Sequence, residues 1–258
     1  MINKELQAIY IMWLRQMKHF IRSKSRIVAS IVQPLFFLVI LGSGFRFATF
    51  PGIKVDYLFF LSPGIIAMAI LFSSMFTGVS VLWDKQFGFL QEVLVAPVSR
   101  MSIILGRTFG GATTALIQGF FILFIAILLG VQISSFYGFI LTLVFMVLIA
   151  FTAVGFGLVI ASKMTDFQGF QIIMNLLIMP LLFLSSAFFP IATSNEWPEI
   201  MVRLSYFNPL FYMVDGLRGS LIGVENAANS PIVNLLIVLI IAIFMMILGS
   251  YFFSKSEA

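Results

Sequence analysis

The sequence predicts an all-α integral membrane protein with six transmembrane helices. Hydrophobic residues make up 61% of the 258-residue chain and charged residues only 10%. The mean hydropathy of +1.11 implies more apolar surface than a soluble core of this length could bury. The charged residues also fall in short stretches between long uncharged runs. We therefore expect one transmembrane domain over residues 1–258, with no separate soluble domain.

The uncharged runs predict the individual spans, because crossing the hydrocarbon layer takes about 20 apolar residues. They cover residues 27–45, 57–83, 108–162, 167–193 and 231–254. The third run has room for two passes, and small and polar residues in its middle favour a turn, namely Gly130, Gln132, Ser134, Ser135 and Gly138. Six spans result, with both termini on one side. Pro34 and Pro180 lie inside spans and predict kinks.

The distribution of basic residues predicts which side the termini occupy, because cytoplasmic loops carry an excess of Lys and Arg. Of the 15 basic residues, eleven fall on the terminal side and four on the other. The eleven are Lys4, Arg15, Lys18, Arg22, Lys24, Arg26, Lys85, Arg100, Arg107, Lys163 and Lys255, and the four are Arg46, Lys54, Arg203 and Arg218. We expect a plasma (inner) membrane protein with both termini in the cytoplasm. Its partners then include anionic membrane lipids, and nucleic acid is not expected.

The first 26 residues predict an amphipathic helix that lies in the membrane interface. Apolar and basic side chains separate onto two faces at helical spacing. The apolar face has Leu6, Ile9, Tyr10, Trp13, Met17 and Phe20, and the basic face has Lys4, Arg15, Lys18 and Arg22. The only histidine, His19, belongs to the basic face, where a solvated or lipid-facing role is expected.

Residues 84–107 carry five charges between two apolar runs, so they must meet water at the membrane face. Phe87, Leu90 and Leu94 recur at i, i+3 and i+7, which is typical of a short amphipathic helix. This spacing predicts a helix that docks against something outside the membrane. A connecting loop in the headgroup layer fits the spacing equally well.

Residues 195–225 are too short to cross the membrane cleanly, yet they are patterned as helix. Leu210, Val214, Leu217 and Leu221 form an apolar stripe at helical spacing. Asp215 and Arg218, at i and i+3, can pair. We expect a re-entrant pair of short helices covered by protein. Asn208-Pro209 and Ser62-Pro63 each resemble an N-cap followed by proline at the first helical position, which predicts two helix starts.

The residue inventory limits the chemistry. The chain has no cysteine and one histidine, which leaves almost no material for thiolate metal sites or nucleophilic catalysis. We expect no catalytic, cofactor-binding or metal-binding residue. No GxxxxGK[ST] phosphate loop occurs, so ATP and magnesium would be bound by a partner polypeptide.

Polar residues inside the spans are few. Ion-coupled carriers keep ionisable groups at mid-membrane depth, and the six predicted spans have none near their centres. Gln171 and Asn175 lie one turn apart in the fifth span, where an unpaired amide costs about 1–3 kcal/mol. We expect them to face protein or a pathway rather than acyl chains. Gly106-x-x-x-Gly110 and Gly219-x-x-x-Gly223 suit close helix contacts, local packing is favoured for both, and neither fixes an oligomer.

Three segments together resemble the membrane subunits of ABC-2 type transporters, close to the daunorubicin-resistance and nodulation-export branch. They are LQEVLVAPVSR at residues 90–100, Ser62-Pro63-Gly64, and NPLFY at residues 208–212 followed by DGLR at residues 215–218. With the six-span layout, the resemblance covers nearly the whole chain. It implies a homodimer, or a pair with a related permease, bound to two cytoplasmic ABC ATPase subunits. The substrate would leave along the subunit interface.

The resemblance also implies roles for residues. A coupling helix in residues 84–102 would dock on the ATPase, formed or braced by Phe89, Leu90, Glu92, Leu94, Pro97 and Arg100. The re-entrant helices of residues 195–225 would form an extracellular gate, with Asn208, Pro209, Tyr212, Asp215 and Arg218. The substrate implied is a lipophilic drug, a lipid or a lipid-linked glycan, exported at the expense of ATP.

Two other functions compete with this interpretation. A gradient-driven carrier or channel would need a midplane ion site, which the sequence does not show, although backbone carbonyls could bind a cation. A membrane assembly factor or scaffold would have no reason to bind an ATPase.

Overall fold

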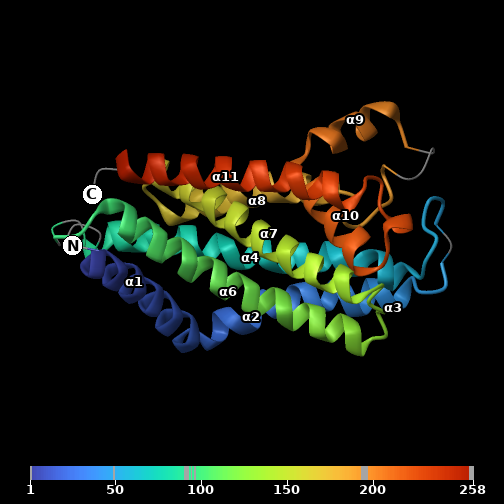
Figure 1. Ribbon diagram of the computed structural model, residues 1–258, viewed down its shortest axis with the longest axis horizontal. Helices are drawn as coiled ribbons and strands as arrows, with labels where there is room; N and C mark the ends of the chain where they lie inside the picture. The colour runs from blue at the N-terminus through green and yellow to red at the C-terminus, as the bar shows by residue number, and fades with distance from the viewer. Residues whose placement is uncertain are drawn as a thin grey trace.

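The structure, a computed structural model, describes residues 2–48, 50–89, 93, 95, 97–192 and 197–255, without the side chains of residues 2, 3 and 26. Within these residues every regular element is helical. The elements are α1 (Ile2–Arg22), α2 (Lys24–Phe36), the π-helix η1 (Phe37–Leu41), α3 (Gly42–Gly44), α4 (Tyr57–Gln86), α6 (Arg100–Leu128), α7 (Phe136–Lys163), α8 (Phe167–Phe183), α9 (Glu199–Phe207), α10 (Pro209–Leu221), the 3₁₀-helix η2 (Val224–Asn226) and α11 (Pro231–Lys255). The long helices run side by side along the longest axis of the molecule (Figure 1).

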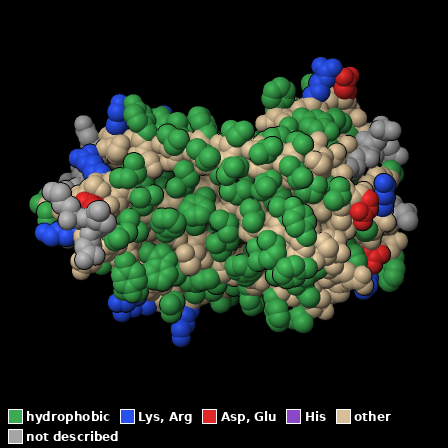
Figure 2. All heavy atoms as spheres, in the orientation of Figure 1, with side chains coloured by type: hydrophobic (Ala, Val, Ile, Leu, Met, Phe, Trp, Pro, Cys, Tyr) green, Lys and Arg blue, Asp and Glu red, His purple; other side chains and the backbone are tan. Residues whose placement is uncertain are grey.

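Five of the described helical runs are long and apolar enough to cross a membrane: Ile27–Gly44, α4, α6, α7 and α11. Helix α8 is apolar but has only 17 residues. Helix α4 is central, since 83% of its most apolar window is buried against 22% for both Ile27–Gly44 and α11. Figure 2 shows a broad band of hydrophobic side chains between two ends that carry the charged ones. A multi-pass membrane protein explains both the band and the buried central helix.

Both chain termini lie at one end of the bundle, here called the terminal end (Figure 1). The link from α4 to α6 lies at this end. Helices α9 and α10 and the loop before α4 lie at the opposite end, here called the far end. Helix α9 stands to one side there, while α10 packs against α4, α7 and α11.

Helix α1 packs along α6 rather than lying apart from the bundle. Two glycines of α6 make this possible, because a Cβ atom at Gly106 would lie 2.7 Å from the carbonyl oxygen of Ile9, and one at Gly110 would lie 2.6 Å from Cβ of Gln16. The local packing expected at Gly106-x-x-x-Gly110 is therefore confirmed, whereas Gly223 of the second motif lies beyond the end of α10 at Leu221. The predicted apolar face of α1 is split by this packing. Met17 and Phe20 are buried, whereas Leu6 and Tyr10 stay exposed.

The prolines affect their helices in different ways. Pro34 lies inside α2 and the π-helix η1 begins three residues later, while the predicted kink stays a prediction. Pro180 lies inside α8, which ends at Phe183. The predicted helix start at Ser62-Pro63 is wrong, because α4 already begins at Tyr57. Ser62 Oγ instead donates a hydrogen bond of 2.9 Å to the Phe59 carbonyl, the group that the missing N–H of proline would otherwise bind.

The predicted helix start at Asn208-Pro209 is confirmed. Asn208 Oδ1 accepts a hydrogen bond of 2.9 Å from Leu210 N, and Pro209 takes the first position of α10. The Asn208 side chain also donates from Nδ2 to the Leu181 carbonyl at 2.6 Å. One residue thus caps α10 and ties its start to the end of α8.

Candidate functional site

The segment between α4 and α6 holds the residues of the predicted docking helix. Leu90, Glu92 and Leu94 lie outside the described residues. Phe89 is described, and its ring lies 3.9 Å from the guanidinium carbon of Arg15 on α1.

The end of this segment is also described. Pro97 is exposed at the terminal end. Arg100 begins α6 and donates from Nη1 to the Ser254 carbonyl of α11 at 2.7 Å. The described part of the segment is therefore anchored to α1 at its start and, through Arg100, to α11 at its end.

A buried ion cluster joins α1, α4 and α6 just before this segment. Asp84, near the end of α4, accepts two hydrogen bonds from Arg15, including one of 2.9 Å from Nη1 to Oδ2. Arg107 of α6 pairs with the same carboxylate. The Arg107 side chain is 2% exposed and the Asp84 side chain 7%, whereas that of Arg15 is 36% exposed. Two positive charges thus share one negative charge at the terminal end.

Glu5 connects α1 to the other end of the segment. Its carboxylate accepts hydrogen bonds from Ser99 N at 3.1 Å, from Ser99 Oγ at 2.8 Å and from Ser102 Oγ. Ser99 Oγ in turn accepts from Ser102 N and caps α6. Hydrogen bonds from Ser102 and then Ser99 lower the pKa of Glu5 below its usual value, since they favour the charged carboxylate.

Helix α1 therefore contacts both ends of the link between α4 and α6. Arg15 reaches Asp84 and Phe89 on the side of α4, and Glu5 reaches Ser99 on the side of α6. Between them lies an open, mainly apolar groove of about 580 Å³. Its lining includes Ile11, Met12, Val93, Pro97 and Val98. A force on this segment would act directly on α1, α4 and α6.

At the far end, α10 brings two buried charges into separate networks. Arg218, 1% exposed, donates to the Ser186 carbonyl at 2.7 Å and lies 3.8 Å from the ring centroid of Phe60. Asp215 accepts from Ala228 N at 2.8 Å and from Asn234 Nδ2 at 2.9 Å. The predicted direct pair of Asp215 with Arg218 is therefore wrong.

Asp215 and Arg218 bind groups of other elements rather than each other. The i, i+3 spacing describes neighbours on a free helix, but this helix is surrounded by carbonyls and amides of other elements, which satisfy each charge instead. Tyr212 also binds outside its own helix, since its hydroxyl donates to the Tyr206 carbonyl of α9 at 2.9 Å. Helix α10 is thereby fixed to α4, to α9, to the chain after α8 and to α11.

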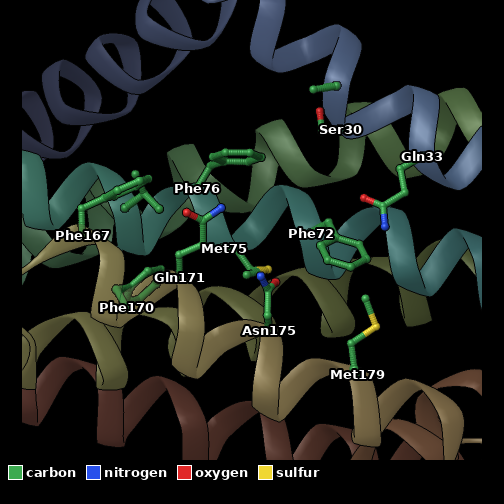
Figure 3. Close-up of a pocket in the computed structure, with 12 residues that line it drawn as sticks. Ser30, Gln33, Phe72, Met75, Phe76, Phe167, Phe170, Gln171, Asn175 and Met179 are labelled. Atoms are coloured by element: carbon green, nitrogen blue, oxygen red, sulfur yellow. The ribbon is translucent and has the colours of Figure 1, made fainter.

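Gln171 and Asn175 line a cavity of about 440 Å³ between α2, α4 and α8. Figure 3 shows their amides together with Gln33 of α2 and the aromatic ring of Phe72 on α4. The remaining lining is mostly apolar or aromatic, and it includes Met75, Phe76, Phe170 and Met179. Both residues are exposed on the single chain, so the expectation that they face protein or a pathway rather than acyl chains stays a prediction.

Sequence reasoning missed the Asp84 cluster and the Glu5 contact. Arg15 and Asp84 are 69 residues apart, and Glu5 and Ser99 are 94 residues apart. The available signal was Asp84 itself, the acidic residue that directly follows an apolar run of 27 residues at positions 57–83. A carboxylate at that depth requires a cationic partner.

Taken together, the bundle and its terminal end define a multi-pass membrane protein in which helix α1 is clamped to a loop between two spans. A family model described as ABC-2 type transporter matches residues 7–222. The chain belongs to this family.

Similar proteins carry related names. The chain is 29% identical over 216 residues to a putative transport permease, ycf38, of Cyanophora paradoxa, covering 83% of this chain and 73% of the relative. It is 25% identical over 243 residues to the inner membrane transport permease YadH of Escherichia coli K12, covering 92% of each. The probable multidrug ABC transporter permease YbhR of the same organism is 29% identical over 163 residues, or 63% of this chain and 43% of the relative. The chain is a membrane permease subunit of an ABC transporter.

Proposed function

We propose that the chain is the permease of an ATP-driven exporter, with six spans, both termini in the cytoplasm and ATP hydrolysed by a separate subunit. The observation that carries the proposal is the clamp of α1 on both ends of the segment between α4 and α6. Its contacts through Arg15 and Glu5 would pass a push on the segment into α4, α6 and α1 together. Helix α8 would be the fifth span, continued by Leu184 and the buried residues 185–188.

The proposed mechanism is mechanical. Two copies of the chain, or one copy and a related permease, would bind two cytoplasmic ABC ATPase subunits. Closure of the ATPase pair on ATP and magnesium would press on each docking segment, through Glu92 and its neighbours, and the membrane halves would rearrange about their interface. Helix α10, with its buried Asp215 and Arg218, would form the extracellular gate between α8 and α11.

The cavity of Gln171 and Asn175 is the proposed entry to the pathway. Its amides provide hydrogen-bonding groups within an otherwise apolar and aromatic lining. Such a lining suits an amphipathic molecule, in which a polar group meets the amides and an apolar body meets Phe72 and Met75. A lipophilic drug, a lipid and a lipid-linked glycan all have this character.

The experiment that tests the proposal is a mild-detergent pull-down of the tagged chain from native membranes, followed by mass spectrometry and an ATPase assay. We expect a stoichiometric ABC ATPase, and we expect Glu92→Ala to release it or to uncouple ATP hydrolysis from substrate. Glu199→Ala is the matched control, because Glu199 is exposed on α9 at the far end. Its effect on ATPase binding should be nil.

Two results would contradict the proposal. One is the absence of any ATPase in several detergents and in nanodiscs, which would favour a gradient-driven carrier. The other is an equal loss of ATPase with Glu92→Ala and Glu199→Ala, which would remove the docking role from the segment.

A further inference from the structure

An open groove of about 500 Å³ on α1 carries basic side chains, two of which, Lys18 and Arg22, the proposed transport cycle does not use. Its lining comprises Ile11, Leu14, Arg15, Lys18, His19, Arg22 and Ser23. Lys18 and Arg22 are exposed, and none of the described lining residues is acidic. The apolar part of the wall comes from Ile11, which is 52% exposed, and from Leu14.

The carboxylate that Arg15 binds does not neutralise the groove. Asp84 is shared by Arg15 and Arg107, so the cluster retains one positive charge. Arg107 is buried, whereas the Arg15 side chain is 36% exposed and lines the groove. The net positive charge of the Asp84 cluster therefore lies at the groove, where Lys18 and Arg22 add two further positive charges.

The groove lies next to an exposed apolar stretch of the chain. Helices α1 and α2 meet in a bend at Ser23, on the side of the bundle (Figure 1). Beyond the bend, α2 exposes Val28, Val32 and Phe36, which suit the acyl layer. Figure 2 shows basic side chains projecting from this same side near the terminal end. A basic groove on α1 next to the apolar helix α2 can bind the phosphate of a lipid whose acyl chains lie against α2.

We propose that this groove binds the headgroup of an anionic phospholipid from the leaflet that surrounds the bend at Ser23. The phosphate would lie among Arg15, Lys18 and Arg22, and the glycerol and first acyl carbons would lie against Ile11 and Leu14. The bound anion also offsets the extra charge of the Asp84 cluster, so it stabilises the fold as any ligand of the native state does. The site is separate from the cavity of Gln171 and Asn175.

The test uses the full chain in neutral detergent, with its thermal unfolding midpoint followed while phosphatidylglycerol is added. Phosphatidylcholine and inorganic phosphate are the comparison probes. Native mass spectrometry of the same samples counts the lipids that remain bound. The variant is Lys18→Gln with Arg22→Gln. The control is Lys24→Gln with Lys255→Gln, which removes two basic charges outside the groove, one at the start of α2 and one at the end of α11.

We expect phosphatidylglycerol to raise the midpoint of the wild type and of the control at similar concentrations. Each charge lost from the groove should weaken this effect about fivefold, or about 25-fold for the pair. If the double variant already unfolds earlier without lipid, the single variants Lys18→Gln and Arg22→Gln should each still show the fivefold shift.

Three outcomes would overturn the proposal. An equal weakening in the variant and the control means diffuse surface attraction. An equal effect of phosphatidylcholine means that the charge is not recognised. An equal effect of inorganic phosphate means an anion site that does not need the membrane. The lipid test uses no ATPase, so a negative result in it does not contradict the proposed transport function. Likewise, a pull-down that finds no ATPase does not contradict the lipid site.

Discussion

Replacing Asp84 with asparagine tests the cluster that joins α1, α4 and α6. The change keeps the size of the side chain but removes the negative charge that two guanidinium groups share. The Arg107 side chain is buried and cannot regain water, whereas the Arg15 side chain can. Removing one partner of a buried pair costs about 3–5 kcal/mol, because the other charge stays behind unpaired. We expect Asp84→Asn to lower the free energy of unfolding by that amount.

The matched control is Asp56→Asn. Asp56 pairs with Arg46 at 3.5 Å, and both side chains are 47% exposed. An exposed pair of this kind contributes about 0–1 kcal/mol. Asp56→Asn should therefore lower the free energy of unfolding several-fold less than Asp84→Asn does.

The assay is unfolding of the purified chain in mixed micelles with a rising fraction of denaturing detergent, which reports the free energy for each variant. Asp84→Asn combined with Arg107→Met should recover part of the loss, because the buried charge is then absent. The reasoning fails if Asp84→Asn costs no more than Asp56→Asn. It also fails if the double variant is no more stable than the single one.

The remaining predictions concern the clamp, the cavity and the topology. The pKa of Glu5 is lowered in the fold, so the stability that its charged carboxylate contributes is present above its ordinary pKa of 4.5 and is lost as the pH falls through the lower pKa of the fold. The difference in unfolding midpoint between wild type and Glu5→Gln should therefore vanish on acidification. A difference that does not change with pH would contradict this. Asn175→Leu should reduce export about 10-fold if an amide contact of about 1.4 kcal/mol is made in transport, while partner binding measured by pull-down stays intact. Single cysteines at Val95 and Phe207, both exposed, should be labelled from the cytoplasm and from outside respectively; labelling from one side only would contradict the six-span topology.

The sequence was sufficient for features that depend on local pattern. Hydropathy located the five helical runs that are long enough to cross a membrane, whereas α8, the predicted fifth of six spans, has only 17 residues. The start of α10 followed from Asn208-Pro209, because a cap needs only the residues beside it. The same kind of signal failed at Ser62-Pro63, where an apolar run that begins at Tyr57 continues the helix through the proline. A continuous run of buried apolar residues outweighs a cap signature, because burial of the whole run stabilises more than one capping hydrogen bond.

Contacts between distant residues could not be predicted from one sequence. Nothing in the spacing relates Arg15 to Asp84, and the i, i+3 rule gave Asp215 the wrong partner because it considers one helix alone. The side of α1 that meets protein was also undetermined, since amphipathicity does not distinguish a membrane surface from a neighbouring helix. The glycines of α6 decide it, because they allow α1 to approach within backbone contact.

The two ends of the bundle differ in how readily their contacts can change. At the far end, Arg218 and Asp215 are buried and bind backbone groups of three other segments, so moving α10 would leave charges unpaired in a dry interior. At the terminal end, Glu5 and Phe89 make their contacts beside water, which can replace them. A push on the segment between α4 and α6 is therefore relieved more easily by a shift of α1 than by a rearrangement of α10. In the proposed transport cycle, the motion would therefore reach α10 as a movement of whole helices, with the Asp84 cluster intact.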